Sequence, residues 1–321
     1  MTLLTASAIA AATLLVLWIL VNSKTSRPDG ALVERLHPYR RVMQYIMPTR
    51  NESLVLFDTY VRAEALLAYI EEARARFPVD VSHCLVAAVG VGLAAVPEMN
   101  QFAVGRRIYQ RKQRHVTFSM KRKQGDRRAK LGTVKLALAD GEPFEALCAR
   151  IDRFIDSERS GARTYADKEF DLLGMLPRPL LLRGVQLARW LDHHNLLPAS
   201  FLDKDPLYTS VFIANVGSLD MGSGYHHLYE WGNCPIFMMV GRIEDRPAVE
   251  NGQVVVQKQL HIRWSYDERI DDGLTARHGL EAVKHALENP ASAFGSLDHA
   301  SGDAGAAAGG RAESAGARAV S

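Results

Sequence analysis

The hydrophobic and polar positions divide this chain into one uninterrupted apolar segment and a longer part in which helical and strand patterns alternate. Residues 3–21 contain no charged side chain and consist mainly of Leu, Ile, Val and Ala. An apolar run of about 20 residues is long enough to cross the hydrocarbon core of a bilayer. A cleaved signal peptide is the alternative, but no Lys or Arg precedes the run and no small-residue cleavage pattern follows it. We therefore predict a transmembrane anchor over residues 1–23.

Basic residues near the apolar segment predict its orientation. They all lie downstream of it, at Lys24, Arg27, Arg35, Arg40 and Arg41. Positively charged flanks of membrane helices face the cytoplasm. The expected location is therefore the inner (plasma) membrane, crossed once, with a juxtamembrane linker over residues 24–36 and the following domain in the cytoplasm.

The pattern after the linker predicts a mixed α/β (α+β) domain with a substantial sheet. Asn251-Gly252 is a strong hairpin signal. The strand that follows it is expected to bury Leu260, Ile262, Trp264 and Tyr266. Ser82 is expected to cap an apolar helix that Pro97 ends. Other strands are expected at residues 51–59, 116–120, 207–216 and 235–243, and other helices at residues 63–77, 142–157 and 276–287.

Composition changes this picture mainly at the C-terminal end. Residues 291–321 are rich in Gly, Ala and Ser and cannot bury enough apolar surface to fold, so we predict a disordered tail. A formal net charge of only +3 argues against a nucleic-acid partner. Cys84, Cys148 and Cys234 are too scattered for a disulfide framework or a metal-binding pattern. We expect no metal and no permanently bound cofactor.

The candidate chemistry lies in residues 267–273, Asp-Glu-Arg-Ile-Asp-Asp-Gly, where the alternating strand ends and the last helix begins. Loops at such strand ends often carry functional side chains. This stretch matches the signature Asp-His-Arg-x-x-Asp-Gly at every fixed position but one. Three other segments, VPEMN with IYQRKQRHVTFSM, FIANVGSLDMGSG and CPIFMMVGRIEDRPAVENGQVVV, occur in the expected order. On these four segments the chain resembles the catalytic domain of the dihydrolipoyl acyltransferases, the core subunits of 2-oxo acid dehydrogenase complexes.

The resemblance covers about residues 37–290 and implies a fold, a substrate class and an assembly. The implied fold is a mixed-sheet sandwich like that of chloramphenicol acetyltransferase. The implied co-substrate is a coenzyme A thioester or an acyl carrier, and the implied assembly is a homotrimer whose active-site channels lie between subunits. Because of the predicted anchor, we also expect the lipid bilayer to be a partner.

Two departures from the family's pattern fall on the groups that the resemblance assigns to catalysis. The signature His, which is the family's general base toward the thiol, is replaced by Glu268. The family's oxyanion-stabilising Ser is replaced by Ala214, which cannot donate a hydrogen bond. Losing one such donor typically costs roughly 100- to 1,000-fold in rate. An exposed glutamate is a poor base toward a thiol, and burial would be needed to strengthen it.

The remaining site residues are expected to support the turn or to offer an alternative base. The resemblance implies that Asp272 is a structural carboxylate that pairs with a buried Arg, either Arg40 or Arg41. A role as the N-cap of the following helix is an equally good interpretation of Asp272. Asn215, Arg269 and Gly273 are expected to be structural, with Gly273 permitting close packing at the start of the helix. His226 and His227, in a Gly-rich turn, are the alternative candidates for a base.

Two segments have no assigned role. Residues 106–130 hold eleven Lys and Arg against one acid, and suit a solvated hairpin, a site for the phosphates of coenzyme A, or a contact with anionic lipid. Residues 177–191 form a predicted helix inserted relative to the family, with Leu181, Val185, Ala188 and Leu191 on one face. It suits either an interfacial membrane helix or packing on its own domain.

Two functional hypotheses follow. The first is a membrane-anchored member of the acyltransferase fold that acts on acyl-CoA or an acyl carrier by a mechanism different from the family's. The second is a catalytically inactive pseudoenzyme that binds an acyl-CoA or serves as a scaffold. No lipoyl domain or subunit-binding domain is recognisable, so we do not expect a working core subunit of a dehydrogenase complex.

Overall fold

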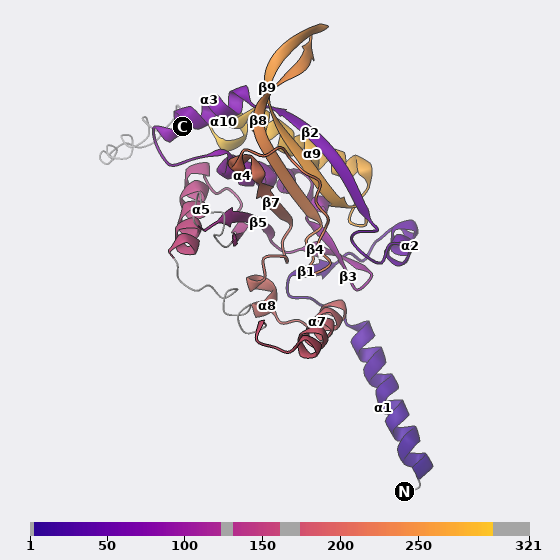
Figure 1. Ribbon diagram of the computed structural model, residues 1–321. Coiled ribbons are helices and arrows are strands. Elements are labelled where there is room, and N and C mark those ends of the chain that lie inside the picture. Colours follow the sequence, from indigo (N-terminus) through magenta and orange to yellow (C-terminus); the bar gives the residue numbers. More distant parts are fainter. Residues whose placement is uncertain (1–2, 123–130, 161–173, 298–321) are drawn as a thin grey trace, which may run out of the picture.

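The computed structural model describes residues 3–122, 131–160 and 174–297, and its centre is a six-stranded mixed sheet (Figure 1). Strand β7 pairs in parallel with β5 and β8, and the other neighbours are antiparallel. In spatial order the strands are β2 (Leu54–Arg62), β9 (Gln253–Asp267), β8 (Ile236–Glu250), β7 (Val211–Asn215), β5 (Arg114–Lys121) and β6 (Leu131–Leu138). The mixed α/β prediction is therefore confirmed.

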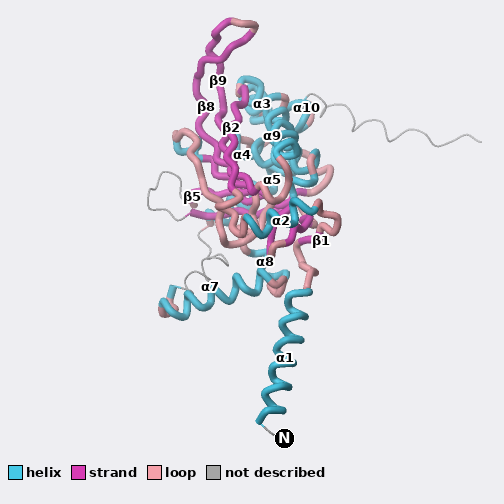
Figure 2. Tube along the Cα trace, turned by 90° about the vertical axis from the view of Figure 1, so that its right-hand side faces the viewer, coloured by secondary structure: helices cyan, strands magenta, loops and turns pink. Residues whose placement is uncertain are grey.

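Helices cover one face of this sheet, and the main hydrophobic core lies between the two layers (Figure 2). The helices of this layer are α3 (Glu64–Arg74), α4 (Val81–Ala95), α5 (Phe144–Arg159), α9 (Gly273–Glu288) and α10 (Pro290–Phe294). Leu260, Ile262, Trp264 and Tyr266 all point into the core, as predicted. Helices α4 and α9 approach closely because both carry glycine there: a Cβ atom at Gly92 would lie 2.5 Å from Val283. We call the opposite face of the sheet the outer face.

A smaller three-stranded sheet lies at the base of the domain. It contains β1 (Gly30–Leu32), β4 (Arg107–Arg111) and β3 (Gln101–Val104), and β3 begins directly after the short helix η1 (Pro97–Asn100). Helix α2 (Pro38–Ile46), helix α8 (Ala199–Lys204) and the turn η2 (Val216–Leu219) complete the described elements apart from α1 and α7. Because β1 pairs with β4, the predicted linker over residues 24–36 is in fact part of the folded domain.

Helix α1 (Leu3–Ser23) projects away from the domain, and α7 (Arg178–His193) runs crosswise to it along the base (Figures 1 and 2). Residues 5–23 are long and apolar enough to cross a membrane by length and composition, criteria that a signal sequence also meets. Helix α7 buries none of its residues. The face that was predicted to be apolar, with Leu181, Val185 and Ala188, is the one partly covered by the domain.

A buried ion-pair network ties the exit of α1 to the end of α7. The Arg27 guanidinium pairs with Asp29 at 2.9 Å and with Asp192 of α7 at 3.0 Å. Asn195 donates from Nδ2 to the carbonyl of Lys24 and to the hydroxyl of Tyr109. Burying these charges is tolerated only because each is paired. The network therefore fixes the position of α7 relative to the first residues after α1.

Three other predictions from the sequence concern the ends of helices and strands, and the structure can be compared with each. Asp80, not Ser82, caps α4, because its carboxylate accepts from the backbone N–H groups of Ser82 and His83. The Asn251-Gly252 hairpin is confirmed, with both residues at positive φ. Residues 291–294 continue the domain as α10, where Phe294 stacks on Phe144. Residues 295–297 of the predicted tail are also described, and residues 298–321 lie outside the described part of the chain.

Candidate active site

A buried ion pair shapes the turn after β9. Asp267 is completely buried, and its carboxylate pairs with Arg269 at 2.7 Å. Ser53 donates to Asp267 Oδ1 at 2.8 Å, and Arg269 also donates to the carbonyl of Met47. Bidentate Arg–carboxylate pairs of this kind fix geometry strongly. The first and third residues of the signature, Asp267 and Arg269, therefore hold the turn.

The second residue of the signature, Glu268, is presented to solvent by this turn. Its side chain is exposed, and its backbone N–H donates to the carbonyl of Ser53 at 3.0 Å. The burial that would strengthen a glutamate base is absent from the single chain. Any environment that makes Glu268 a better base must therefore come from another molecule.

Ala214 lies far from Glu268 within one chain. It lies on the outer face in β7. Its cross-strand partner is Met239 of β8, which in turn pairs with Arg263 of β9. Glu268 comes five residues after Arg263, which places it about 16 Å further along the strand direction at roughly 3.3 Å per residue. The positions assigned to base and oxyanion donor thus do not meet in a single subunit.

Asp272 caps helix α9 and does not pair with a buried arginine. Its Oδ1 accepts from the backbone N–H of Thr275 at 2.8 Å, and this hydrogen bond lowers the pKa of the exposed carboxylate. Arg40 instead donates to the carbonyl of Arg269, and Arg41 is exposed. The expected Asp272–arginine pair is therefore wrong, and the N-cap reading holds. The buried ion pair lies at Asp267 and Arg269 instead, because β9 ends by directing both inward.

Two further expectations concern Gly273 and Asn215. A Cβ atom at Gly273 would meet nothing within 4 Å, so the predicted close packing at this glycine is wrong for the single chain. Asn215 links β7 to its surroundings: its Oδ1 accepts from the Ser218 backbone and its Nδ2 donates to Ser82.

Asp271 is a residue of the turn that sequence reasoning missed. It is 4% exposed, and burial raises its pKa to about 7. Tyr266 donates its hydroxyl proton to Oδ2, whereas Oδ1 has no hydrogen-bond partner among the described residues. A buried carboxyl group that titrates near neutrality is a candidate proton carrier. Nothing in Ile-Asp-Asp-Gly distinguishes the buried Asp271 from the exposed Asp272, because the direction of the turn decides which of them points inward.

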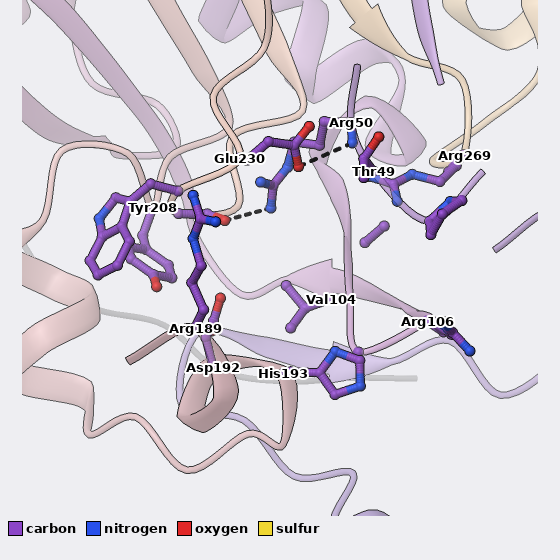
Figure 3. Close-up of a pocket in the computed structure, with 15 residues that line it drawn as sticks. Thr49, Arg50, Val104, Arg106, Arg189, Asp192, His193, Tyr208, Glu230 and Arg269 are labelled. Carbon is purple, nitrogen blue, oxygen red and sulfur yellow. Dashed lines mark hydrogen bonds between the residues drawn. The ribbon is translucent and has the colours of Figure 1, made fainter. Parts of the chain in front are cut away.

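A basic cavity of about 420 Å³ adjoins this turn (Figure 3). It lies between the turn, the small sheet and the C-terminal end of α7. The charged groups in its wall are Arg50, Arg106, Arg189 and Arg269, opposed by Asp192 and Glu230. Arg50 is fully engaged, since it donates to the carbonyls of Tyr229 and Gly232, and burial lowers its pKa. The excess of arginine suits an anionic group of a ligand.

The basic stretch that was predicted from residue 106 onward is not a uniformly solvated hairpin. Arg111 is buried, burial lowers its pKa to about 10, and it donates to Asn233 Oδ1 at 2.8 Å. Arg107 donates to the carbonyl of Asn22 at the end of α1, and Arg106 lines the cavity. Residues 123–130 lie outside the described part of the chain.

His226 lies on the outer face, and its neighbour His227 is exposed. The His226 ring stacks on Phe237 with centroids 3.8 Å apart, and its Nδ1 donates to the carbonyl of His227 at 2.6 Å. Burial lowers the pKa of His226, which favours the neutral ring. His226 therefore shares a face with Ala214, but among the described residues its ring makes no hydrogen bond to a serine, threonine or cysteine side chain.

Comparison with known proteins relates this fold to the acyltransferase domains of 2-oxoacid dehydrogenase complexes. Residues 208–295 match the family model "2-oxoacid dehydrogenases acyltransferase (catalytic domain)". A probable dihydrolipoamide acetyltransferase from Listeria monocytogenes superposes with a TM-score of 0.54 at 15% identity, covering 87% of this chain and 98% of the other. The dihydrolipoamide acetyltransferase from Azotobacter vinelandii, studied for catalytic roles of a serine, a histidine and an asparagine, superposes with a TM-score of 0.53 at 14% identity. The superposition covers 85% of this chain and 94% of the other. At these identities the likeness establishes the fold.

Curated relatives match over short segments only. The succinyltransferase component of the 2-oxoglutarate dehydrogenase complex from Cupriavidus necator is 52% identical over 48 residues, 15% of this chain and 12% of the relative. The branched-chain lipoamide acyltransferase from Pseudomonas putida is 41% identical over 64 residues, 19% and 15% of the two chains. The resemblance to the catalytic domain of 2-oxoacid dehydrogenase acyltransferases is thus confirmed, although the matched segments span less than a fifth of these relatives' length.

Proposed function

We propose that this chain is a membrane-anchored protein of the acyltransferase fold that acts on acyl-CoA or an acyl carrier by a mechanism that does not use the family's histidine and serine. The observation that supports this most is the turn at Asp267–Arg269. A buried ion pair holds the turn rigidly while Glu268 projects into solvent beside a basic cavity. A general base must be held within hydrogen-bond reach of the proton that it takes, and a fixed turn supplies this positioning.

The distance between Glu268 and Ala214 makes the proposed site intermolecular. In a homotrimer, Glu268 of one subunit would face the outer face of a neighbour, and contact would remove it from water. That burial would strengthen it as the acceptor of the thiol proton. Arg106 and Arg189, the cavity arginines that are not already bound to carbonyl groups or to Asp267, would bind phosphate groups of the acyl donor.

The second candidate function is a pseudoenzyme that binds an acyl-CoA without turning it over. The replacement of the oxyanion donor by Ala214, which lies in a small apolar cluster with Phe212 and Phe237, favours this alternative. The two functions share the binding step and differ only in the chemical step.

Titration of the detergent-solubilised protein with acyl-CoA, followed by assay of free thiol release, tests both functions. We expect binding, together with slow thiol release that Glu268→Gln lowers. Glu281→Gln, an exposed glutamate on α9 away from the turn, is the matched control and should leave both unchanged. Binding without release would favour the pseudoenzyme. Absence of binding to every acyl-CoA would end the acyl-transfer proposal.

The membrane part of the proposal is supported by the arrangement of α1 and α7. Helix α7 runs crosswise to α1 at the base of the domain, so a bilayer crossed by α1 would lie along α7 (Figure 2). On α7 the side chains of Leu180, Leu187 and Trp190 are 58%, 57% and 47% exposed. Leucine, tryptophan and interspersed arginine are typical of helices that lie in a membrane interface.

Site-specific fluorescence quenching in liposomes tests this arrangement. An environment-sensitive dye on Leu187→Cys should be quenched by lipids labelled high in the acyl chain, and a dye on Val16→Cys by lipids labelled near the chain end. Val254→Cys, at the distant hairpin, is the unquenched control. The native cysteines are buried, and burial raises the pKa of each thiol, so labelling at neutral pH favours the new cysteine. Quenching at Val16 alone would retain the anchor and reject the α7 contact.

A further inference from the structure

Three polar side chains from three separate segments form a chain of hydrogen bonds on the outer face. His261 belongs to β9, Asp58 to the edge strand β2, and Ser223 to the loop that crosses this face after η2. Ser223 Oγ lies 2.8 Å from His261 Nδ1, and His261 Nε2 lies 2.7 Å from Asp58 Oδ1. A hydroxyl, an imidazole and a carboxylate in this order are the arrangement that activates a serine nucleophile.

The partners determine which nitrogen carries the proton. An ionised carboxylate can only accept, so Nε2 of His261 must donate to Asp58. In the neutral ring Nδ1 then has a free lone pair, and the Ser223 hydroxyl donates to it. Burial opposes ionisation of Asp58, but hydrogen bonds from His261 and Arg263 lower the pKa of its carboxyl group overall. The tautomer that Asp58 selects is therefore the one in which His261 is a base toward Ser223.

Neighbouring groups hold this cluster in place and leave it reachable. Tyr60 stacks on the His261 ring with centroids 4.4 Å apart and an interplanar angle of 14°. His261 is 8% exposed, whereas Ser223 is half-buried and the Asp58 side chain is 38% exposed. The loop of Ser223 packs directly on β8 because residue 241 is glycine: a Cβ atom there would lie 2.5 Å from the Ser223 nitrogen.

The cluster adjoins the row of the sheet that contains Ala214. The residues paired across the sheet from Ala214 are Met239, Arg263 and finally Asp58 of the edge strand β2. Arg263 donates from Nη1 to the carbonyl of Ser223 at 2.8 Å and from Nε to Asp58 Oδ1 at 2.9 Å. A guanidinium near the acyl carbon can stabilise the negative charge of a tetrahedral intermediate, and Arg263 touches this cluster through the Ser223 backbone carbonyl and Asp58. Arg263 thus offers, from the same chain, the type of donor that Ala214 lacks.

We propose that Ser223, His261 and Asp58 form a second acyl-transfer site in which Ser223 is the nucleophile, His261 the base and Asp58 a positioning residue. The class of donor, an acyl ester or thioester, rests on the function proposed above. Ser223 Oγ bonds to the acyl carbon as its proton passes to His261 Nδ1. The carbon–sulfur bond then breaks, and the thiolate leaves with the proton from His261. Water or an acceptor hydroxyl next loses its proton to His261, attacks the seryl ester and returns Ser223 Oγ–H as the product departs.

Covalent labelling of the full chain with a fluorophosphonate tests the site without reference to any acyl donor. Attack by an activated serine forms a phosphorus–oxygen bond and expels fluoride. We expect peptide mass analysis to find the adduct on Ser223, with labelling lost in Ser223→Ala and reduced at least tenfold in His261→Gln. Ser218→Ala, an exposed serine of η2 whose hydroxyl bonds a carbonyl, is the matched control and should label normally.

Asp58→Asn separates positioning from structure. It should shift the pH profile of labelling, because a neutral amide no longer selects the tautomer, while the melting temperature stays close to that of the parent. No adduct on Ser223 in a folded protein would overturn the proposal. Thiol release from acyl-CoA that survives Ser223→Ala but not Glu268→Gln would also overturn it while leaving the proposed function intact. An adduct on Ser223 without any acyl-CoA turnover would support the site and reject the thioester as its donor.

Discussion

At the scale of single residues, the two replaced positions Glu268 and Ala214 determine what chemistry the turn can perform. Glu268 projects from a turn that Asp267 and Arg269 keep rigid, so a different side chain at this position would occupy the same direction. Ala214 lies in a regular strand whose pairing does not depend on its side chain. Both positions should therefore accept the family's residues without loss of the fold.

The first prediction follows from this tolerance. Glu268→His combined with Ala214→Ser should raise the rate of acyl transfer or hydrolysis from acyl-CoA above that of the parent. Each single change should raise this rate less than the double change, because a base and an oxyanion donor act on the same transition state. Steady-state thiol release measures all four proteins. A double variant that binds acyl-CoA yet stays as slow as the parent would show that the channel geometry has changed.

The second residue-scale prediction concerns Asp271. Its pKa is raised from an unfolded value near 3.9 to about 7. The folded state therefore binds more protons than the unfolded state between these values, and the free energy of unfolding falls as pH rises from about 4 to about 7. Asp271→Asn should remove this slope and stabilise the protein at pH 8 by up to a few kcal/mol. Denaturant unfolding at pH 5 and pH 8 measures it, and an unchanged slope would contradict the assignment.

At the scale of elements, the end of β9 and the start of α9 depend on carboxylates in very different surroundings. Asp267 forms an ion pair that is buried on both sides, whereas Asp272 makes a hydrogen bond at an exposed helix start. Removing one member of a buried pair leaves an uncompensated charge, while removing a cap leaves one unsatisfied backbone N–H.

These surroundings predict costs of different size. Asp267→Asn should lower the free energy of unfolding by about 3 to 5 kcal/mol. Asp272→Ala should lower it by about 1 kcal/mol, and Asp272→Asn should be close to neutral because asparagine is an equally good cap. Chemical unfolding of the three variants gives the comparison. Equal costs for Asp267→Asn and Asp272→Ala would mean that the turn is not held by the buried pair.

At the scale of the whole molecule, the ribbon formed by β8 and β9 extends beyond the sheet (Figure 1). Val249, Val254 and Val256 share one face of this ribbon and are 72%, 76% and 78% exposed. A lone two-stranded ribbon is marginally stable in water. In the proposed homotrimer this ribbon would pack on a neighbouring subunit.

We predict that a chain lacking residues 1–25 has the mass of three subunits in solution. Val256→Lys should shift this mass toward one subunit, because it places a charge in the proposed contact, whereas Lys284→Glu on α9 should not. Light scattering coupled to gel filtration measures the mass. A monomeric parent would remove the intermolecular site in which Glu268 is proposed to act.

The orientation of the chain is the second whole-molecule prediction. If the basic residues after α1 face the cytoplasm, a reporter enzyme active only outside the cytoplasm should stay silent when fused after Pro290. A reporter of cytoplasmic activity fused at the same position should be active. The reverse pattern would invert the proposed topology and place the cavity on the other side of the membrane.

The sequence by itself determined the elements whose signals are local. The apolar run that became α1, the hairpin at Asn251-Gly252 and the alternation of β9 follow from periodicity and turn chemistry, which act between near neighbours. The four matching segments determined the fold and the position of the turn that displays Glu268.

Only the tertiary structure decided which polar groups meet. Asp271 and Asp272 are adjacent and chemically identical, yet the path of the chain buries one and exposes the other. Ser223, His261 and Asp58 come from segments that strand pairing and a glycine at residue 241 bring together, and no local pattern marks them. Arg27 and Asp192 join across 165 positions of sequence. Such contacts depend on the packing of distant segments, which hydrophobic periodicity along the chain does not encode.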